Sequence, residues 1–246
     1  MSEEHLNKKK LHWKLILGRC LILLGGPTML FFFWKIGARR FYLCSMAMVI
    51  MAMVPFFLRF EKRKPQAREL VTIAVLCAIA VASRAAFAMI PFFKPIVGIV
   101  MIVGMAFGAE AGFLAGAISA FVSNFFFGQG MWTPWQMFAY GIGGFLAALF
   151  YRWGIIGERD RFQRIVNPIF GFAAIIGVVG PILDVSSILS MGDEITMGWA
   201  ISTFVAGFEV NVVHGVATAL TLLFLCKPMM EKLNRIKLKY GMIDGE

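Results

Sequence analysis

The sequence has little charge and lacks the motifs of common ATP-driven and hydrolytic enzymes. Only 15% of its 246 residues are charged and 59% are hydrophobic, whereas soluble domains carry about 25% charged residues. It contains no GxxxxGKS/T phosphate loop, no HExxH zinc motif and no GxSxG nucleophile motif. We therefore do not expect a soluble enzyme, and we do not expect the chain to hydrolyse ATP itself.

Cysteine and clustered metal ligands are also scarce. The four cysteines, Cys20, Cys44, Cys77 and Cys226, lie in or beside apolar segments without CxxC spacing, so we interpret them as small apolar residues. We expect neither a bound metal nor a cofactor. The net charge of +10 does not indicate nucleic-acid binding, because the Lys and Arg residues lie between apolar segments.

What the chain does contain is apolar segments long enough to cross a membrane, which takes about 20 residues. Its mean hydropathy is +0.77, and no segment alternates like a membrane β-strand. The sequence therefore predicts an all-α integral membrane protein. The predicted spans are 14–34, 40–58, 69–90, 95–109, 111–127, 134–152, 165–189 and 197–226. The fourth and fifth are short, and they form either one tight hairpin or a re-entrant pair.

Basic residues gather in both tails and in every second loop, where they include Lys8, Lys14, Arg59, Lys62, Arg152, Arg164, Lys227 and Lys239. By the positive-inside rule, this pattern predicts an even number of spans and both termini in the cytoplasm. It also predicts a multi-pass protein of the cell membrane, which we expect to be a bacterial plasma membrane.

The basic stretch 59–68, which contains Pro65, is the best internal boundary. The predicted organisation is a basic tail (1–13), an N-terminal helix pair (14–58), a basic cytoplasmic linker (59–68), a six-helix membrane core (69–226) and a second basic tail (227–246). The helix pair has almost no polar residues inside its spans, so we interpret it as lipid-facing scaffold. The stretch Met229–Tyr240 has the pattern of a basic helix that lies on anionic lipid.

Small residues recur at every fourth position in two parts of the sequence. Residues with this spacing lie on one face of a helix, and small ones allow the backbone of another helix to approach closely. The glycine ladder is Gly104, Gly108, Gly112, Gly116 and Ala120, and the alanine ladder is Ala74, Ala78, Ala82 and Ala86. We interpret the glycine ladder as packing within the chain. The alanine ladder either packs internally or docks a second membrane protein.

Polar residues inside apolar segments are costly and often functional. Here they fall in the middle or the predicted outer part of the spans, and the loop FGQGMWTPWQ (127–136) lies on the same side. We expect them to line an outward-facing pocket for an organic ligand. The candidate substrate-binding residues are Arg84, Asn124, Gln129, Trp132, Trp135, Gln136, Asp184, Glu209, Asn211 and His214.

Each of these positions also has a structural interpretation. The two tryptophans of the loop have the character of membrane-interface residues. Arg84, in one alternative, pairs with Glu209 or Asp184 and so holds helices together. His214 bridges helices as readily as it contacts a ligand, and a lone histidine is weak support for a metal site.

Two stretches resemble a known family. GMAFGAEAGFLAGAISAFVSNFFFGQGMWTPWQMFAYGIGGFLAALF (104–150) and VVHGVATALTLLFLCKPMMEKLNRIKLKYG (212–241) are similar to the S components of energy-coupling-factor (ECF) vitamin transporters, most specifically in FFFGQGMWTPWQM. The resemblance covers roughly 69–241. It implies a six-helix core that binds a vitamin near the outer face. It also implies partners, namely a transmembrane coupling subunit and two cytoplasmic ATPases, with the alanine ladder at the coupling interface.

Within the family, the WTPWQM loop and the VVHGVAT segment look most like S components assigned to cobalamin or related corrinoids. Others are assigned to different vitamins or to queuosine precursors. The amides Asn124, Gln129, Gln136 and Asn211 are consistent with a large amide-rich ligand. The helix pair at 14–58 departs from the family, and it leaves open whether the alanine ladder is free for the coupling subunit.

Two other functions are compatible with the same polar residues. One is a stand-alone, proton-coupled secondary transporter in which Glu209, His214 and Asp184 relay protons. The other is a membrane enzyme that acts on a lipid or an isoprenoid. The resemblance favours a substrate-binding subunit, which is not an enzyme.

Overall fold

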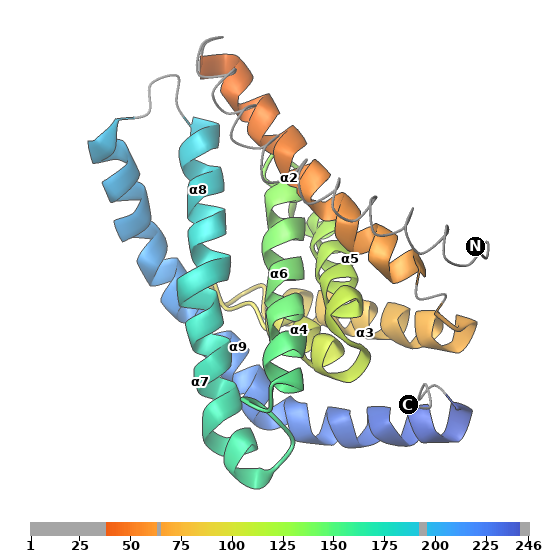
Figure 1. Cartoon of the computed structure of the whole chain (residues 1–246). Coiled ribbons are helices and arrows are strands. Elements are labelled where there is room, and N and C mark those ends of the chain that lie inside the picture. The colour runs from red at the N-terminus through yellow and green to blue at the C-terminus, as the bar shows by residue number, and fades with distance from the viewer. Residues whose placement is uncertain (1–37, 63–64, 192–195, 242–246) are drawn as a thin grey trace, which may run out of the picture.

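Every regular element is a helix in the part of the chain that the computed structural model describes, residues 38–62, 65–191 and 196–241 (Figure 1). The helices in chain order are α2 (Ala38–Lys62), α3 (Ala67–Ala86), α4 (Ile96–Phe107), α5 (Ala109–Phe127), α6 (Thr133–Arg152), α7 (Asn167–Ala174), α8 (Gly180–Met191) and α9 (Met197–Tyr240). The all-α fold class is confirmed for these residues. The predicted first span, 14–34, lies outside them.

Several helices have the length and composition needed to cross a membrane. A short π-helical stretch at Phe162–Val166 precedes α7, and another at Ile175–Val179 joins α7 to α8. Together they form one rod, Phe162–Ser190, of 29 residues. This rod, α3, α5 and α9 are long and apolar enough to span a bilayer. They support a multi-pass membrane protein, while the eight spans and the cytoplasmic termini stay predictions.

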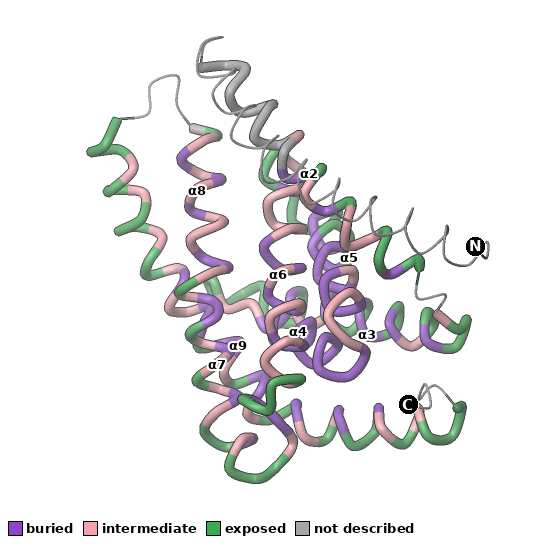
Figure 2. The backbone as a smooth tube through the Cα atoms, viewed as in Figure 1, coloured by how far each residue is buried: buried purple, intermediate pink, exposed green. Residues whose placement is uncertain are grey.

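The helix α4 lies at the centre of the bundle, and all 12 of its residues are buried. At 1.5 Å per residue it is about 18 Å long, too short to cross a hydrocarbon core of about 30 Å. Gly108 joins it directly to α5 with a φ of 93°, a conformation that favours glycine. The short fourth and fifth segments therefore fold back on each other at Gly108, as both predicted alternatives require. Figure 2 shows buried backbone concentrated around α4, α5 and α6.

The glycine ladder brings the backbones of α4, α5 and α6 into contact. A Cβ atom on Gly112 would lie 2.7 Å from both the Gly104 Cα and the Gly144 carbonyl oxygen. At Gly116, the nearest atoms would be backbone atoms of Tyr140 and Gly141. These spaces hold no side chain, so the interpretation of this ladder as internal packing is confirmed.

The helix α2 packs on α5 and α6 at one side of the bundle (Figure 1). Val49 and Met53 are buried in a cluster with Phe113 and Ala117, and the rings of Phe56 and Phe113 stack with their centroids 3.9 Å apart. Several apolar residues elsewhere on the helix are exposed. The described member of the N-terminal pair is therefore packed against the core as well as open to lipid.

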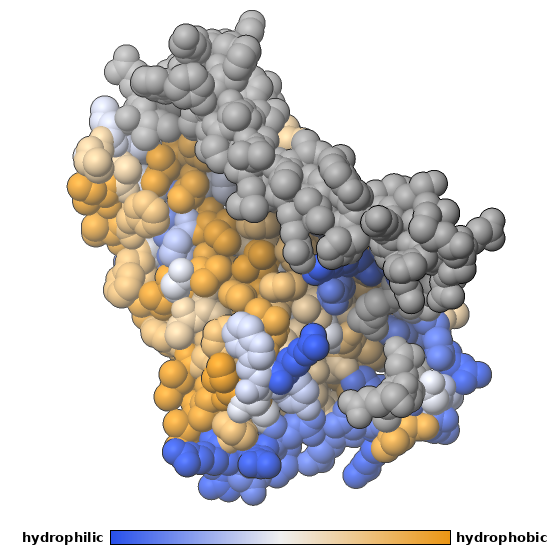
Figure 3. All heavy atoms as spheres, viewed as in Figure 1, coloured by the Kyte–Doolittle hydropathy of each residue, from blue (hydrophilic) through white to orange (hydrophobic). Residues whose placement is uncertain are grey.

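The last helix, α9, runs for 44 residues although Pro228 lies inside it. It bends, and its C-terminal part crosses beneath the bundle (Figure 1). Met230 and Leu233 are buried, and Lys237 donates a hydrogen bond to the Ala106 carbonyl near the end of α4. The last predicted span ended at 226, but the helix continues because its next apolar residues find a surface on the protein. Hydrophilic side chains gather along this lower edge in Figure 3.

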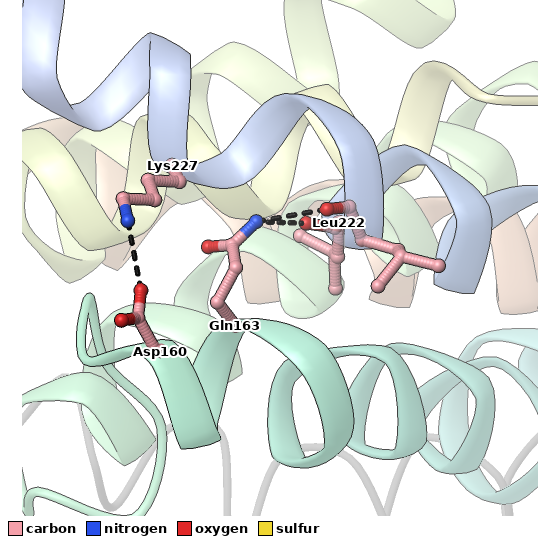
Figure 4. Close-up of polar contacts among 5 residues, drawn as sticks. Asp160, Gln163, Leu222 and Lys227 are labelled. Atoms are coloured by element: carbon pink, nitrogen blue, oxygen red, sulfur yellow. Dashed lines mark hydrogen bonds and ion pairs between the residues drawn. The ribbon is translucent and has the colours of Figure 1, made fainter.

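The segment that follows α6 holds α9 just before Pro228 (Figure 4). Gln163 Nε2 donates to the carbonyl oxygens of Leu222, at 3.2 Å, and Leu223, at 2.9 Å. Lys227 Nζ donates to Asp160 Oδ1 at 2.8 Å, and this hydrogen bond lowers the pKa of the Asp160 carboxyl from its ordinary value. The position of α9 in the bundle therefore depends on polar contacts as well as on apolar packing.

Candidate functional site

Arg84 connects α3 to α5 through polar contacts. Its guanidinium Nη1 donates to Ser123 Oγ at 2.6 Å and to Asn124 Oδ1 at 2.9 Å. Its Cζ also lies 4.5 Å from the centroid of the Phe127 ring, a cation–π contact. The predicted alternative in which Arg84 pairs with Glu209 or Asp184 is wrong, because neutral groups of α5 hold the guanidinium.

The same contacts continue from α5 to α6. Asn124 Nδ2 donates to Thr133 Oγ1 at 3.2 Å and to Gln136 Oε1 at 2.7 Å. Thr133 Oγ1 in turn donates to Gln129 Oε1 at 2.9 Å, and Gln129 Nε2 donates to the Phe121 carbonyl at 3.0 Å. We call the linked side chains the Arg84 network: Arg84, Ser123, Asn124, Gln129, Thr133 and Gln136.

The Arg84 network brings together four of the predicted site residues, Arg84, Asn124, Gln129 and Gln136. It adds Ser123 and Thr133, which were not among the predicted residues. Hydroxyl side chains are ordinary in membrane helices, so their presence alone gave no signal. The Asn124 amide bonds to Thr133 and Gln136, and the Gln129 amide bonds to Thr133 and the Phe121 carbonyl. Each of these amides therefore already has a partner within the protein.

Asp184 and Asn211 form a second contact, between α8 and α9. Asn211 Nδ2 donates to Asp184 Oδ2 at 2.8 Å, and both side chains are buried. Gly180 and Gly207 lie directly against this pair, where a Cβ atom would collide with the polar side chain. The two residues were predicted to bind substrate, and the structure shows them paired across the helix interface.

Tyr140 of α6 and His214 of α9 form a third group near the middle of the bundle. Their rings meet edge to face with centroids 5.9 Å apart. Both side chains are buried, and neither Tyr140 Oη nor His214 Nε2 has a hydrogen-bond partner in the structure. Buried polar atoms nearly always have partners, so this pair is the clearest candidate for contact with a bound molecule.

The third group adjoins the Arg84 network. Gln136 and Tyr140 lie four residues apart on α6 and so share one helix face. Further buried hydroxyls without partners belong to Ser186 of α8 and Thr218 of α9. We call Tyr140, His214 and the adjoining Arg84 network the candidate site.

Besides Asp184 and Asn211, three further predicted residues lie outside the candidate site. Trp132 is 47% exposed. Trp135 packs in the apolar cluster of α2 and α5 on a different face of α6 from Tyr140, and its buried indole Nε1 has no hydrogen-bond partner in the structure. Glu209 is exposed on α9 and makes no described hydrogen bond or ion pair. Tyr140 was missed, since a tyrosine in an apolar span has no distinctive sequence signal.

The alanine ladder is exposed along its whole length, from Ala74 to Ala86. Beside it runs an apolar groove of about 240 Å³ whose lining comes only from α3 and α5, including Ala74, Ala78 and Ile118. The described helix α2 does not line this groove. Among the described residues, no group of three or more His, Cys, Asp or Glu side chains is placed to hold a metal ion.

Comparison with known proteins gives one result. A family model described as "ECF-type riboflavin transporter, S component" matches residues 64–231, which include α3 to the bend of α9. Neither the curated proteins nor the solved structures give a match to the chain.

Proposed function

Because the chain belongs to the ECF-type riboflavin transporter S-component family, we propose that it captures riboflavin, or a close flavin relative, from outside the cell. The family consists of transporter subunits, not enzymes, and an S component works with an ECF module and a small vitamin substrate. Passage to the cytoplasm then uses ATP hydrolysed by the partner subunits, since the chain has no nucleotide motif of its own.

The observation that carries this proposal is the buried Tyr140–His214 pair with its free polar atoms. Two aromatic rings with hydrogen-bonding tips fit a flat heteroaromatic ligand that has its own ring nitrogens and carbonyls. A ligand that pairs with Tyr140 Oη and His214 Nε2 gains the hydrogen bonds that these atoms lack within the protein.

The expectation of a corrinoid has no support in the family description, which names riboflavin. It rested on the resemblance of the WTPWQM loop and the VVHGVAT segment, and the amide side chains were only consistent with it. The contacts of those amides in the structure do not favour an amide-rich ligand. Asn124 and Gln136 bond to each other, Gln129 bonds to Thr133 and the α5 backbone, and Asn211 bonds to Asp184. Side chains with partners inside the protein are poor candidates for recognising an amide-rich ligand.

The exposed alanine ladder supports docking of the coupling subunit on α3. Small residues on a lipid-exposed helix face allow close approach of another helix, and nothing in α2 covers the adjoining groove. The described helix of the N-terminal pair packs on α5 and α6 instead. We therefore expect the coupling subunit to dock beside Ala78 while α2 remains in place.

The proton-relay alternative fits the geometry less well. Its three residues do not form a chain of contacts, because Asp184 pairs with Asn211 while Glu209 is exposed without a described partner. A relay needs groups within hydrogen-bond reach of one another or of bridging water.

Titration of the purified full-length chain with riboflavin tests the proposal, with quenching of flavin fluorescence as the readout. Saturable one-site binding supports it, and cyanocobalamin in excess should not displace the flavin. Absence of flavin binding together with tight binding of cyanocobalamin would contradict the proposal and restore the corrinoid hypothesis.

A further inference from the structure

We propose that the substrate of the candidate site carries a negatively charged oxygen group, a phosphate or a carboxylate, and that Arg84 binds this group. The inference rests on the proposed function and narrows its substrate class. The family description names riboflavin, which has no such group, so the inference points to a phosphorylated or otherwise acidic flavin.

The first argument is the burial of an unneutralised charge. Arg84 is only 9% exposed, and a buried ion is costly unless an opposite charge pairs with it. Its described partners are the Ser123 hydroxyl, the Asn124 amide and the Phe127 ring. All three are neutral.

The second argument is the distribution of acidic groups. The ion pairs Arg59–Glu110 and Lys227–Asp160 both lie outside the candidate site. The buried carboxylate of Asp184 is bonded to Asn211 rather than to Arg84. The described site thus has an excess of positive charge.

The third argument is the number of unused donors. A guanidinium has five N–H donors in a planar fork, and only Nη1 of Arg84 has described hydrogen-bond partners. The fork matches the two oxygens of a carboxylate or phosphate. Tyr140 Oη is a further potential donor without a partner. The arrangement resembles an anion site more than a site for a neutral sugar-alcohol chain.

A lipid headgroup phosphate is the other source of the same chemistry, since Phe125 and Phe126 beside Asn124 are exposed. The proposal commits to the substrate as the source. A bilayer of phosphatidylcholine with or without phosphatidylglycerol distinguishes the two, because a substrate anion is recognised equally well in both.

The test compares riboflavin with riboflavin 5′-phosphate, which differ only in the phosphate. Affinities are measured for the full chain and for Arg84→Gln, Arg84→Lys and the exposed control Arg235→Gln in lipid nanodiscs of both compositions. We expect the wild type and the control to prefer the phosphate form. Arg84→Gln should lose about 10- to 100-fold in affinity for that form, the effect of one charged hydrogen bond, and under about threefold for riboflavin. Arg84→Lys should recover part of the loss.

If the wild type binds riboflavin 5′-phosphate no more tightly than riboflavin, the inference is wrong and the proposed function still stands. This comparison uses the wild type alone, so it remains valid if Arg84→Gln does not fold. A preference that disappears when phosphatidylglycerol is added would assign the anion to lipid and also overturn it. If neither riboflavin nor riboflavin 5′-phosphate binds, the proposal that the substrate is a flavin is wrong. In that case the proteins are melted in inorganic phosphate and in chloride at equal ionic strength. Stronger stabilisation of the wild type than of Arg84→Lys by phosphate supports the anion site, and equal stabilisation overturns it.

Discussion

Tyr140 of α6 and His214 of α9 meet edge to face with ring centroids 5.9 Å apart, and neither Tyr140 Oη nor His214 Nε2 has a protein partner. A hydrogen bond made within the protein stabilises the fold, whereas a polar atom left without one stabilises nothing until a ligand arrives. The unpartnered polar atoms of Tyr140 and His214 are therefore free to bond to a ligand.

Replacing Tyr140 with phenylalanine should therefore weaken riboflavin binding without lowering thermal stability. Loss of one hydrogen bond corresponds to roughly 1–2 kcal/mol, or about a 5- to 30-fold rise in Kd. The matched control is Tyr151→Phe, because the Tyr151 hydroxyl lies 2.7 Å from Glu158 Oε1. That change should lower the melting temperature and leave the riboflavin Kd unchanged. The reverse pattern would place the ligand elsewhere.

Asn211→Ala should act mainly on stability. It leaves the buried Asp184 carboxylate without the hydrogen bond that joins α8 to α9, at a cost of roughly 1–3 kcal/mol. Melting of the ligand-free protein in detergent measures the effect, and Ser202→Ala at an exposed position of α9 serves as control. An Asn211→Ala protein that melts like wild type but has lost riboflavin binding would restore the original prediction that Asn211 contacts substrate.

Gly112→Ala should prevent normal packing of α4, α5 and α6, because its Cβ would lie 2.7 Å from the Gly104 Cα. Overpacking of this kind costs roughly 1–3 kcal/mol or more. Gly177→Ala is the matched change, since a Cβ at that position meets nothing within 4 Å. Size-exclusion profiles and melting curves should show loss of folded Gly112→Ala and a normal Gly177→Ala. Equal behaviour of the two variants would contradict the glycine contact.

Ala78→Leu should leave riboflavin binding unchanged and abolish copurification with the coupling subunit. A leucine adds bulk to the exposed face of α3 without touching the candidate site, and close helix contact in lipid tolerates only small residues. Ala173→Leu, on the exposed side of α7, is the matched control, because it makes the same substitution away from α3. Copurification that survives Ala78→Leu would indicate that the coupling subunit binds another face.

The sequence predicted the helices and part of the candidate site because length, apolar composition and four-residue spacing act locally. The glycine ladder and the meeting of Arg84, Asn124, Gln129 and Gln136 follow from such patterns. The side chains that each polar residue contacts depend on how its helix is rotated about its own axis. Local sequence patterns do not determine that rotation.

Trp135 and α9 illustrate this limit. The tryptophan faces α2 rather than Tyr140 because residues five apart on a helix point in different directions. A proline at position 228 is normally expected to end a helix, yet α9 continues through it because Met230 and Leu233 find a buried surface.

The backbone contact of α4, α5 and α6 at Gly104, Gly112 and Gly144 leaves no side chain that can change rotamer between them. We expect these three helices to move as one unit, because no flexible side chain lies between them at these glycines. On the proposed function, a rearrangement that admits the ligand would then come from the elements packed around them, α3, α8 and α9.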